Sequence, residues 1–249
     1  MMPLRESLGR PWIIGHRGAS GEAPENTMAA FRLALEQGAD MVETDVQLTA
    51  DGIPVLLHDA TVERTTSGQG LVREHSLAEI RALDAGSWFD PRYAGETVPT
   101  LEELLEWAAR ETPVCLEIKN GPVYYPGIEE KVVEALRRHS MAERAVVISF
   151  DHHAVLRVKG LCPECICGVL YACRPVEPTA LAVAARAEVL LPHWGYLDGD
   201  TVEEVHSRGL AVSSWTADRE REMRWLASIG VDGIATNYPG RLAGVLKRG

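Results

Sequence analysis

Nine short apolar runs alternate with amphipathic segments along nearly the whole chain, and this alternation constrains the fold more than any other feature. One connection differs from the rest, because only residues 47–52, which include the turn Thr49-Ala50-Asp51-Gly52, separate the second run from the third. Parallel strands need a dozen or more connecting residues, so the third run is expected to be antiparallel to the second. Eight runs then remain for a parallel sheet. The runs cover residues 12–15, 41–46, 53–57, 114–118, 145–149, 166–171, 189–191, 211–215 and 233–235.

Eight parallel strands joined by helices, within 249 residues, are typical of an α/β chain that folds as one (β/α)8 TIM barrel. We therefore interpret residues 1–249 as a single domain. Two helix starts carry capping boxes, Ser76 with Glu79 and Thr100 with Glu103. Helices are also expected at residues 26–37, 127–139, 152–159, 178–187, 201–208, 219–228 and 241–246.

The connection between the antiparallel arm and the next strand is too long for one loop and one helix. It spans 55 residues, 59–113. An insertion of that size in a compact domain usually has a function. We interpret it as a small cap over the mouth of the barrel, with a plain surface excursion as the alternative.

The charge of the chain restricts its partners. The formal net charge is -11 and the pI is near 5.2, which disfavours nucleic acid and anionic membrane surfaces. No apolar stretch reaches the length of a membrane span, and residues 1–10 lack the apolar core of a signal peptide. These features predict a cytoplasmic protein without stable membrane association that acts on a small molecule.

Two acidic residues interrupt the second apolar run. Glu43 and Asp45 are two positions apart in a predicted strand, so they project to the same side with Cα atoms about 6.5 Å apart. Two carboxylates that lie so near each other in a buried setting repel each other unless a positive charge compensates. A hard divalent cation with oxygen ligands is the simplest candidate, so the sequence predicts a metal site here.

Further polar residues follow the ends of other strands, where the catalytic groups of a barrel lie. His16 and Arg17 end the first strand, His58 ends the hairpin arm, and Glu117 and Lys119 share one face of the strand at 114–118. Three carboxylates, two cations and two histidines suit phosphodiester hydrolysis, with a metal and cations balancing phosphoryl charge and histidines moving protons. The alternative is a set of buried ion pairs that only stabilise the fold, for instance Glu43 with Arg17 and Glu117 with Lys119. Apolar residues could often replace such pairs.

Several short motifs follow one another in a fixed order over nearly the whole chain. They are His16-Arg17-Gly18, Pro24-Glu25-Asn26-Thr27, Glu43-Thr44-Asp45-Val46, Thr49-Ala50-Asp51-Gly52, His58-Asp59, Leu116-Glu117-Ile118-Lys119, Ser149-Phe150, Ser214-Trp215-Thr216 and the segment 230–239. Their order and spacing resemble the glycerophosphodiester phosphodiesterase family. The resemblance implies a metal-dependent barrel hydrolase that cleaves glycerophosphodiesters to sn-glycerol 3-phosphate and an alcohol.

The resemblance also implies roles for individual residues. One divalent cation, calcium or magnesium, would be held by Glu43, Asp45 and Glu117. His16 and His58 would be the acid and base pair, with either assignment possible. The substrate would be bound by Arg17 at the phosphate, Lys119 beside it and Trp215 at the glycerol or alcohol. Asn237 stands where many relatives have an acidic residue.

Two other functions compete with this interpretation. The same barrel could act as a lysophospholipase D on a substrate with one acyl chain, and Trp88 and Phe89 could line its channel. A non-catalytic barrel that binds a glycerophosphate would show the loss of a histidine or a metal carboxylate, and this sequence shows neither.

Some residues have weaker expected roles. Trp194, Tyr124 and Tyr125 could reach the ligand, whereas Glu25 and Asn26 are expected to cap the helix that follows them. Four of the five cysteines crowd into twelve residues, and we interpret them as reduced structural thiols, with a disulfide or a bound metal as the alternative. These four are Cys162, Cys165, Cys167 and Cys173.

Overall fold

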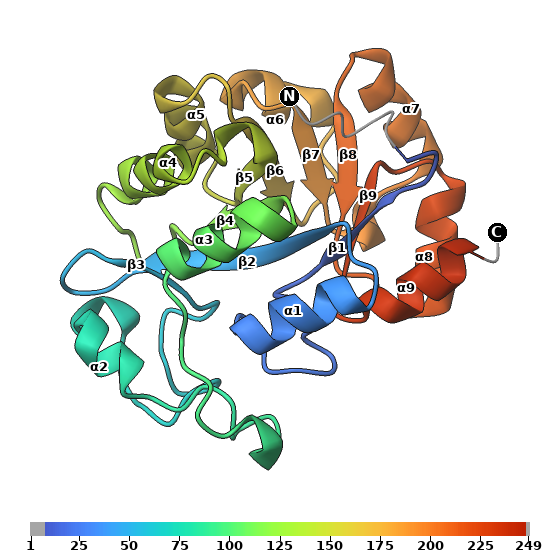
Figure 1. Cartoon of the computed structure of the whole chain (residues 1–249). Helices are drawn as coiled ribbons and strands as arrows, with labels where there is room; N and C mark the ends of the chain where they lie inside the picture. Colours follow the sequence, from blue (N-terminus) through green and yellow to red (C-terminus); the bar gives the residue numbers. More distant parts are fainter. Residues whose placement is uncertain (1–7, 248–249) are drawn as a thin grey trace.

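The computed structural model describes residues 8–247 and contains a closed barrel of eight parallel strands (Figure 1). The strands run in the order β1-β9-β8-β7-β6-β5-β4-β2, and pairing of β1 with β2 closes the ring. The predicted TIM barrel is therefore confirmed. Residues 1–7 lie outside the described part of the chain. They make up most of the segment, 1–10, that is predicted to lack the apolar core of a signal peptide.

The strands have the short lengths expected for a barrel, and their register places residues of neighbouring strands side by side. The bounds are β1 Trp12–Gly15, β2 Met41–Leu48, β3 Pro54–Leu56, β4 Val114–Ile118, β5 Ala145–Ser149, β6 Ile166–Tyr171, β7 Val189–Pro192, β8 Ala211–Ser214 and β9 Gly233–Thr236.

The third strand pairs with β2 in the antiparallel direction, as the short turn predicted, with Val46 opposite Leu56. Gly52 closes this turn at φ +74, a left-handed conformation that glycine adopts without steric cost. The arm runs back along β2 from Leu48, and Leu57 N–H donates to the carbonyl of Asp45, so the chain places His58 near the acidic residues of β2.

Helices surround the barrel and bury their apolar faces against it. Both predicted capping boxes form, at Ser76 and Thr100, whereas the first helix is capped by Thr27. The prediction that Glu25 and Asn26 cap this helix is therefore wrong. The helices are α1 Met28–Glu36, α2 Leu77–Arg81, α3 Leu101–Glu111, α4 Ile128–Arg138, α5 His152–Leu161, α6 Pro178–Ala185, α7 Gly199–Ser207, α8 Glu220–Ser228 and α9 Pro239–Lys247.

Apolar side chains fill two layers of the barrel. One cluster occupies the inside, where Ile14, Val146 and Leu191 meet. A larger cluster lies between the strands and the helices and includes Phe31, Leu116 and Leu136. The inside of the barrel is thus a packed apolar core, and the polar side chains predicted for the site lie toward the carboxyl ends of the strands.

The segment after β3 forms a separate small unit beside the barrel, near α1 (Figure 1). It contains α2 and two short 3₁₀ helices, Val72–Glu74 and Pro91–Tyr93, and it leads into α3. Its own core packs Val62, Val72 and Ile80 against β3 residues. Arg92 and Tyr93 donate hydrogen bonds to the carbonyl of Glu22, in the loop that follows β1. These contacts tie the unit to the mouth of the barrel, while its function as a cap stays a prediction.

A disulfide joins Cys162 to Cys165, so the interpretation of all four clustered cysteines as reduced thiols is wrong. Helix α5 ends at Leu161, and the chain then turns so that Cys165 N–H donates to the carbonyl of Cys162. This turn leaves the two Cα atoms 5.4 Å apart, within the range of a disulfide. Cys167 and Cys173 are free.

In residues 8–247, every helix is too short or too polar to cross a membrane.

Candidate active site

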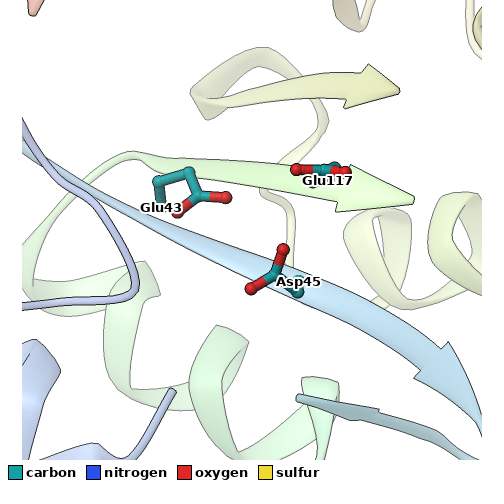
Figure 2. A group of neighbouring side chains, drawn as sticks. All are labelled: Glu43, Asp45 and Glu117. Carbon is teal, nitrogen blue, oxygen red and sulfur yellow. The ribbon is translucent and has the colours of Figure 1, made fainter. Parts of the chain in front are cut away.

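The three predicted metal carboxylates lie on neighbouring strands and point into one space (Figure 2). Glu43 and Asp45 come from β2 and Glu117 comes from β4, where it is the register partner of Asp45. One oxygen of each carboxylate lies within 4.8 Å of an oxygen of each of the others, and all three residues are buried. The alternation of the strand therefore brings together the acids that the sequence predicted.

Two cations flank the carboxylates. Arg17 Nε lies 3.2 Å from Asp45 Oδ2, and Lys119 Nζ lies 2.7 Å from Glu117 Oε1 and 3.5 Å from Asp45 Oδ1. The backbone N–H of Arg17 donates a hydrogen bond to Glu43 Oε2 over 2.9 Å. Of the two ion pairs proposed as a purely structural alternative, Glu117 with Lys119 forms, but the guanidinium of Arg17 contacts other acids instead of Glu43.

The local backbone explains how Arg17 reaches this position. Arg17 has φ +57, a left-handed conformation that turns its amide toward Glu43. Gly18 follows with φ +82, and a Cβ there would lie 2.5 Å from the backbone of Ala30. Glycine is therefore required in the His-Arg-Gly turn for two reasons, its conformation and the close approach of α1.

The surroundings shift the pKa values of the three carboxyl groups in different directions. Burial, followed by repulsion from Asp45, raises the pKa of Glu117 to about 7, and burial and the other two acids raise the pKa of Glu43 well above its usual value. Burial also opposes the charge of Asp45, but Arg17 and Lys119 outweigh it and lower the pKa of this carboxyl. The cluster thus holds more negative charge than the two cations compensate.

These features fit a bound divalent cation. Asp45 Oδ1 is buried without a hydrogen-bond partner, so it is available as a ligand. Glu43 and Glu117 would release their protons in exchange for the cation, because its charge removes the repulsion that raises their pKa values. An all-oxygen donor set suits calcium or magnesium.

His16 follows β1 and is held by a neutral partner. Its Nδ1 lies 2.7 Å from Asn237 Oδ1, which also accepts a hydrogen bond from Ser20. The amide of Asn237 cannot turn over freely, because its Nδ2 donates to Asp218 Oδ2. Asn237 therefore presents an acceptor, so Nδ1 of His16 carries the hydrogen and Nε2 has the lone pair. Burial, with the neighbouring charge of Arg17, lowers the pKa of His16 to about 4.

His58 is held by a carboxylate. Its Nδ1 lies 2.7 Å from Asp59 Oδ1, and Arg64 donates to the same carboxylate from Nε, 2.6 Å from Oδ2. Burial lowers the pKa of His58, while Asp45 and Asp59 oppose this shift. Asp59 itself remains ionised, because Arg64 and His58 lower its pKa to about 2. The two histidines thus have partners of different charge.

Six of the seven polar side chains predicted for the site line one pocket at the mouth of the barrel, and its opposite wall is apolar. The seventh, Asp45, is not part of the lining but contacts Arg17 and Lys119, which are. Trp215 forms part of this wall and is fixed by a hydrogen bond from Nε1 to the carbonyl of Leu191. Phe150 and His193 contact the Trp215 ring edge to face. The lining comprises Ile14, His16, Arg17, Glu43, His58, Cys115, Glu117, Lys119, Ile148, Phe150, Leu170, Leu191, Ser213, Trp215 and Ala235.

All eight predicted site residues therefore meet in one place, and their roles stay predictions. The weaker candidates lie elsewhere: Trp194 lines a separate groove, Tyr124 is exposed, and Tyr125 is buried and donates to Gln47. The interpretation of Tyr125 as part of a closing loop is wrong, because its hydroxyl is held inside the fold.

Three residues of the site were not assigned a role from the sequence, and a fourth, Glu25, was assigned a different one. Asp59 directly follows His58, and this adjacency is a signal for a ring partner. Arg64 and Asp218 give no such signal, because they meet their partners only in the folded chain. Glu25 contacts Arg17 and Arg64 instead of capping a helix.

Comparison with known proteins agrees with the geometry. A family model described as the glycerophosphoryl diester phosphodiesterase family matches residues 16–241. A glycerophosphodiester phosphodiesterase of Caldanaerobacter subterraneus subsp. tengcongensis is 43% identical over 238 residues, which cover 95% of this chain and 98% of that protein. One from Bacillus subtilis is 34% identical, covering 94% of this chain and 85% of its own.

Solved structures give the same result. A phosphodiesterase from Oleispira antarctica, in complex with the product sn-glycerol-3-phosphate, superposes with a TM-score of 0.88 at 34% identity and covers 96% of this chain and 97% of its own. A putative enzyme from Silicibacter pomeroyi has a TM-score of 0.87 at 31% identity, covering 98% and 96%. The barrel, the pocket and these matches together show that the chain is an enzyme of the glycerophosphoryl diester phosphodiesterase family.

Proposed function

We propose that the protein hydrolyses glycerophosphodiesters to sn-glycerol 3-phosphate and an alcohol, with one divalent cation in its site. The observation that carries the proposal is the meeting of three buried carboxylates with Arg17, Lys119 and two histidines at the mouth of the barrel. The Oleispira relative bound to sn-glycerol-3-phosphate supports the choice of product. A cytoplasmic location and a small-molecule substrate fit the acidic composition and belong to the same proposal.

Glu43, Asp45 and Glu117 would hold the cation, which when bound polarises a phosphoryl oxygen and neutralises charge. Arg17 and Lys119 lie beside these acids and would bind the remaining non-bridging oxygens, where negative charge gathers during the reaction. The guanidinium suits this task because it presents several donors in a fixed plane.

The histidines would divide the proton transfers. His16 presents the lone pair of Nε2 and is neutral, so it is suited to accept a proton from the attacking hydroxyl or water. His58 lies beside the Asp59 carboxylate, which stabilises a positive ring, so it is suited to donate a proton to the leaving alcohol. The apolar wall at Trp215 and Phe150 would face the organic part of the substrate.

The direct test is release of glycerol 3-phosphate from glycerophosphocholine and glycerophosphoethanolamine with calcium, magnesium or manganese supplied. We expect turnover with at least one metal and loss of turnover in excess EDTA. The absence of product from every glycerophosphodiester and metal tried would refute the assignment.

The apolar wall also makes a lysophospholipid the natural competing substrate. Within the described residues, however, the pocket lining includes neither Trp88 nor Phe89, the two side chains proposed for an acyl channel. Both belong to an aromatic cluster with Tyr93 in the insertion. We therefore expect higher kcat/KM on glycerophosphocholine than on lysophosphatidylcholine, and the reverse order would favour a lysophospholipase D.

A further inference from the structure

The guanidinium of Arg64, outside the pocket, contacts the carboxylates that hold two residues of the site, His58 and Arg17. Arg64 lies six residues after His58, at the start of the insertion. Its Nη1 and Nη2 lie 2.8 and 2.9 Å from the two oxygens of Glu25, and its Nε and Nη2 lie 2.6 and 3.2 Å from the two oxygens of Asp59. The side chain thus makes a paired contact with each of two carboxylates.

Each of these carboxylates holds a residue of the pocket. Asp59 accepts from the ring of His58, and Glu25 accepts from Arg17 Nη1 at 2.9 Å. Arg64 itself does not line the pocket in the part of the chain that the structure describes. It is therefore placed to orient His58 and Arg17 without touching the substrate.

The charges explain why a cation is needed at this point. Asp59 and Glu25 face each other across Arg64, and Glu25 is largely buried, with a side chain 12% exposed. Without Arg64, the one ion-pair partner left to Glu25 within residues 8–247 would be Arg17, whose guanidinium also faces Asp45. Asp59 would lose its only other ion-pair partner among the described residues and could rotate away from His58.

We propose that Arg64 is a positioning residue for the reaction, which sets the ring of His58 through Asp59 and the guanidinium of Arg17 through Glu25. This inference rests on the proposed function of those two residues. It also gives the insertion 59–113 a task, since its first segment would brace the mouth of the barrel.

The test compares Arg64→Ala, Arg64→Lys and Arg81→Ala. Loss of an outer partner of this kind typically costs about 10- to 100-fold in activity, so we expect Arg64→Ala to lower kcat by that factor and to raise KM because Arg17 is freed. Lysine keeps the charge but cannot form both paired contacts, so Arg64→Lys is expected to restore only part of the loss.

Arg81 is the matched control. It lies in the same insertion and makes a paired contact with Glu103 at 2.8 Å, far along the chain from Asp59 and Glu25. Removing it costs one exposed ion pair, so Arg81→Ala should keep kcat and KM within about twofold of the wild type. A fall in kcat for Arg64→Ala no larger than for Arg81→Ala would overturn the proposal.

Two further measurements separate positioning from folding. If Arg64 acts through Asp59, adding Arg64→Ala to Asp59→Asn should lower kcat less than it does in the wild type, whereas independent effects would multiply. The ¹⁵N signals of the His58 ring report its tautomer and hydrogen bond without any assay, and we expect them to change in Arg64→Ala and not in Arg81→Ala. Inactive wild-type enzyme would refute the proposed function, and these ring signals would still decide whether Arg64 holds His58; unchanged signals would overturn the inference.

Discussion

The ring of His16 lies 2.7 Å from the side-chain oxygen of Asn237, and these two residues are 221 positions apart in the chain. Barrel closure produces this contact, because β1 and β9 are neighbours and both residues follow the ends of those strands. Asp218 completes the arrangement by accepting from Nδ2 of Asn237 at 2.7 Å. A neutral residue thus performs the orienting task that a carboxylate performs for His58.

Asn237→Ala should lower kcat by about 10- to 100-fold, because His16 loses the acceptor that fixes its tautomer. The expected change in KM is small, since Asn237 does not line the pocket among the described residues. Steady-state kinetics checks this prediction. In a His16→Ala background the same substitution should have little further effect, and a full additional loss there would show that Asn237 acts by another route.

His16→Ala and His58→Ala should each lower kcat by about 10²- to 10⁴-fold, the usual contribution of general acid and base catalysis. Neither histidine belongs to the carboxylate cluster, so both variants should bind calcium or magnesium like the wild type. Calorimetric titration of the metal, done beside the assay, tests the separation of roles. Loss of metal binding in either variant would contradict it.

Glu117→Gln should reveal the cost of the crowded carboxylates in metal-free protein. The pKa of Glu117 is about 7 in the fold against 4.5 when unperturbed, so the folded state binds the extra proton and this stabilising effect is lost as pH rises through that interval. Relative to the wild type, the unfolding free energy of the variant should therefore rise by about 3 kcal/mol between pH 4.5 and pH 8. His16 and His58, whose pKa values are lowered in the fold, change stability with the opposite sign, and comparing the two proteins removes their contribution.

Denaturant unfolding in EDTA at several pH values measures this difference. In a second measurement without EDTA, a free divalent cation at about 100 times its Kd should stabilise the wild type by about 2.7 kcal/mol and the variant far less. A difference between the two proteins that does not change with pH would show that Glu117 is ionised in the metal-free fold.

Removing the disulfide should affect stability and leave catalysis unchanged. Cys162 and Cys165 precede β6, at the end of the barrel opposite the pocket, and their bond closes a loop with a separation of three residues. A loop that short contributes about 2 kcal/mol, so Cys162→Ala/Cys165→Ala should unfold at lower denaturant concentration with unchanged kcat and KM. Mass spectrometry of the untreated protein should show the loss of two hydrogens.

The sequence by itself determined the barrel and the polar side chains that meet at its mouth. Strand periodicity, the four-residue turn before β3 and the polar residues at strand ends are local features, and a parallel barrel brings all such ends to one face. Glu43, Asp45 and Glu117 could be grouped for this reason alone, because alternation fixes the side of the strand from which each projects.

Only the tertiary structure decided which groups hold these residues in place. The contacts of His16 with Asn237 and of Arg64 with Glu25 join segments that no short-range pattern links, and they depend on barrel closure and on side-chain rotamers. The bond between Cys162 and Cys165 likewise depends on how the chain turns after α5. Local periodicity specifies where a side chain points, whereas its hydrogen-bond partner is specified by packing between distant segments.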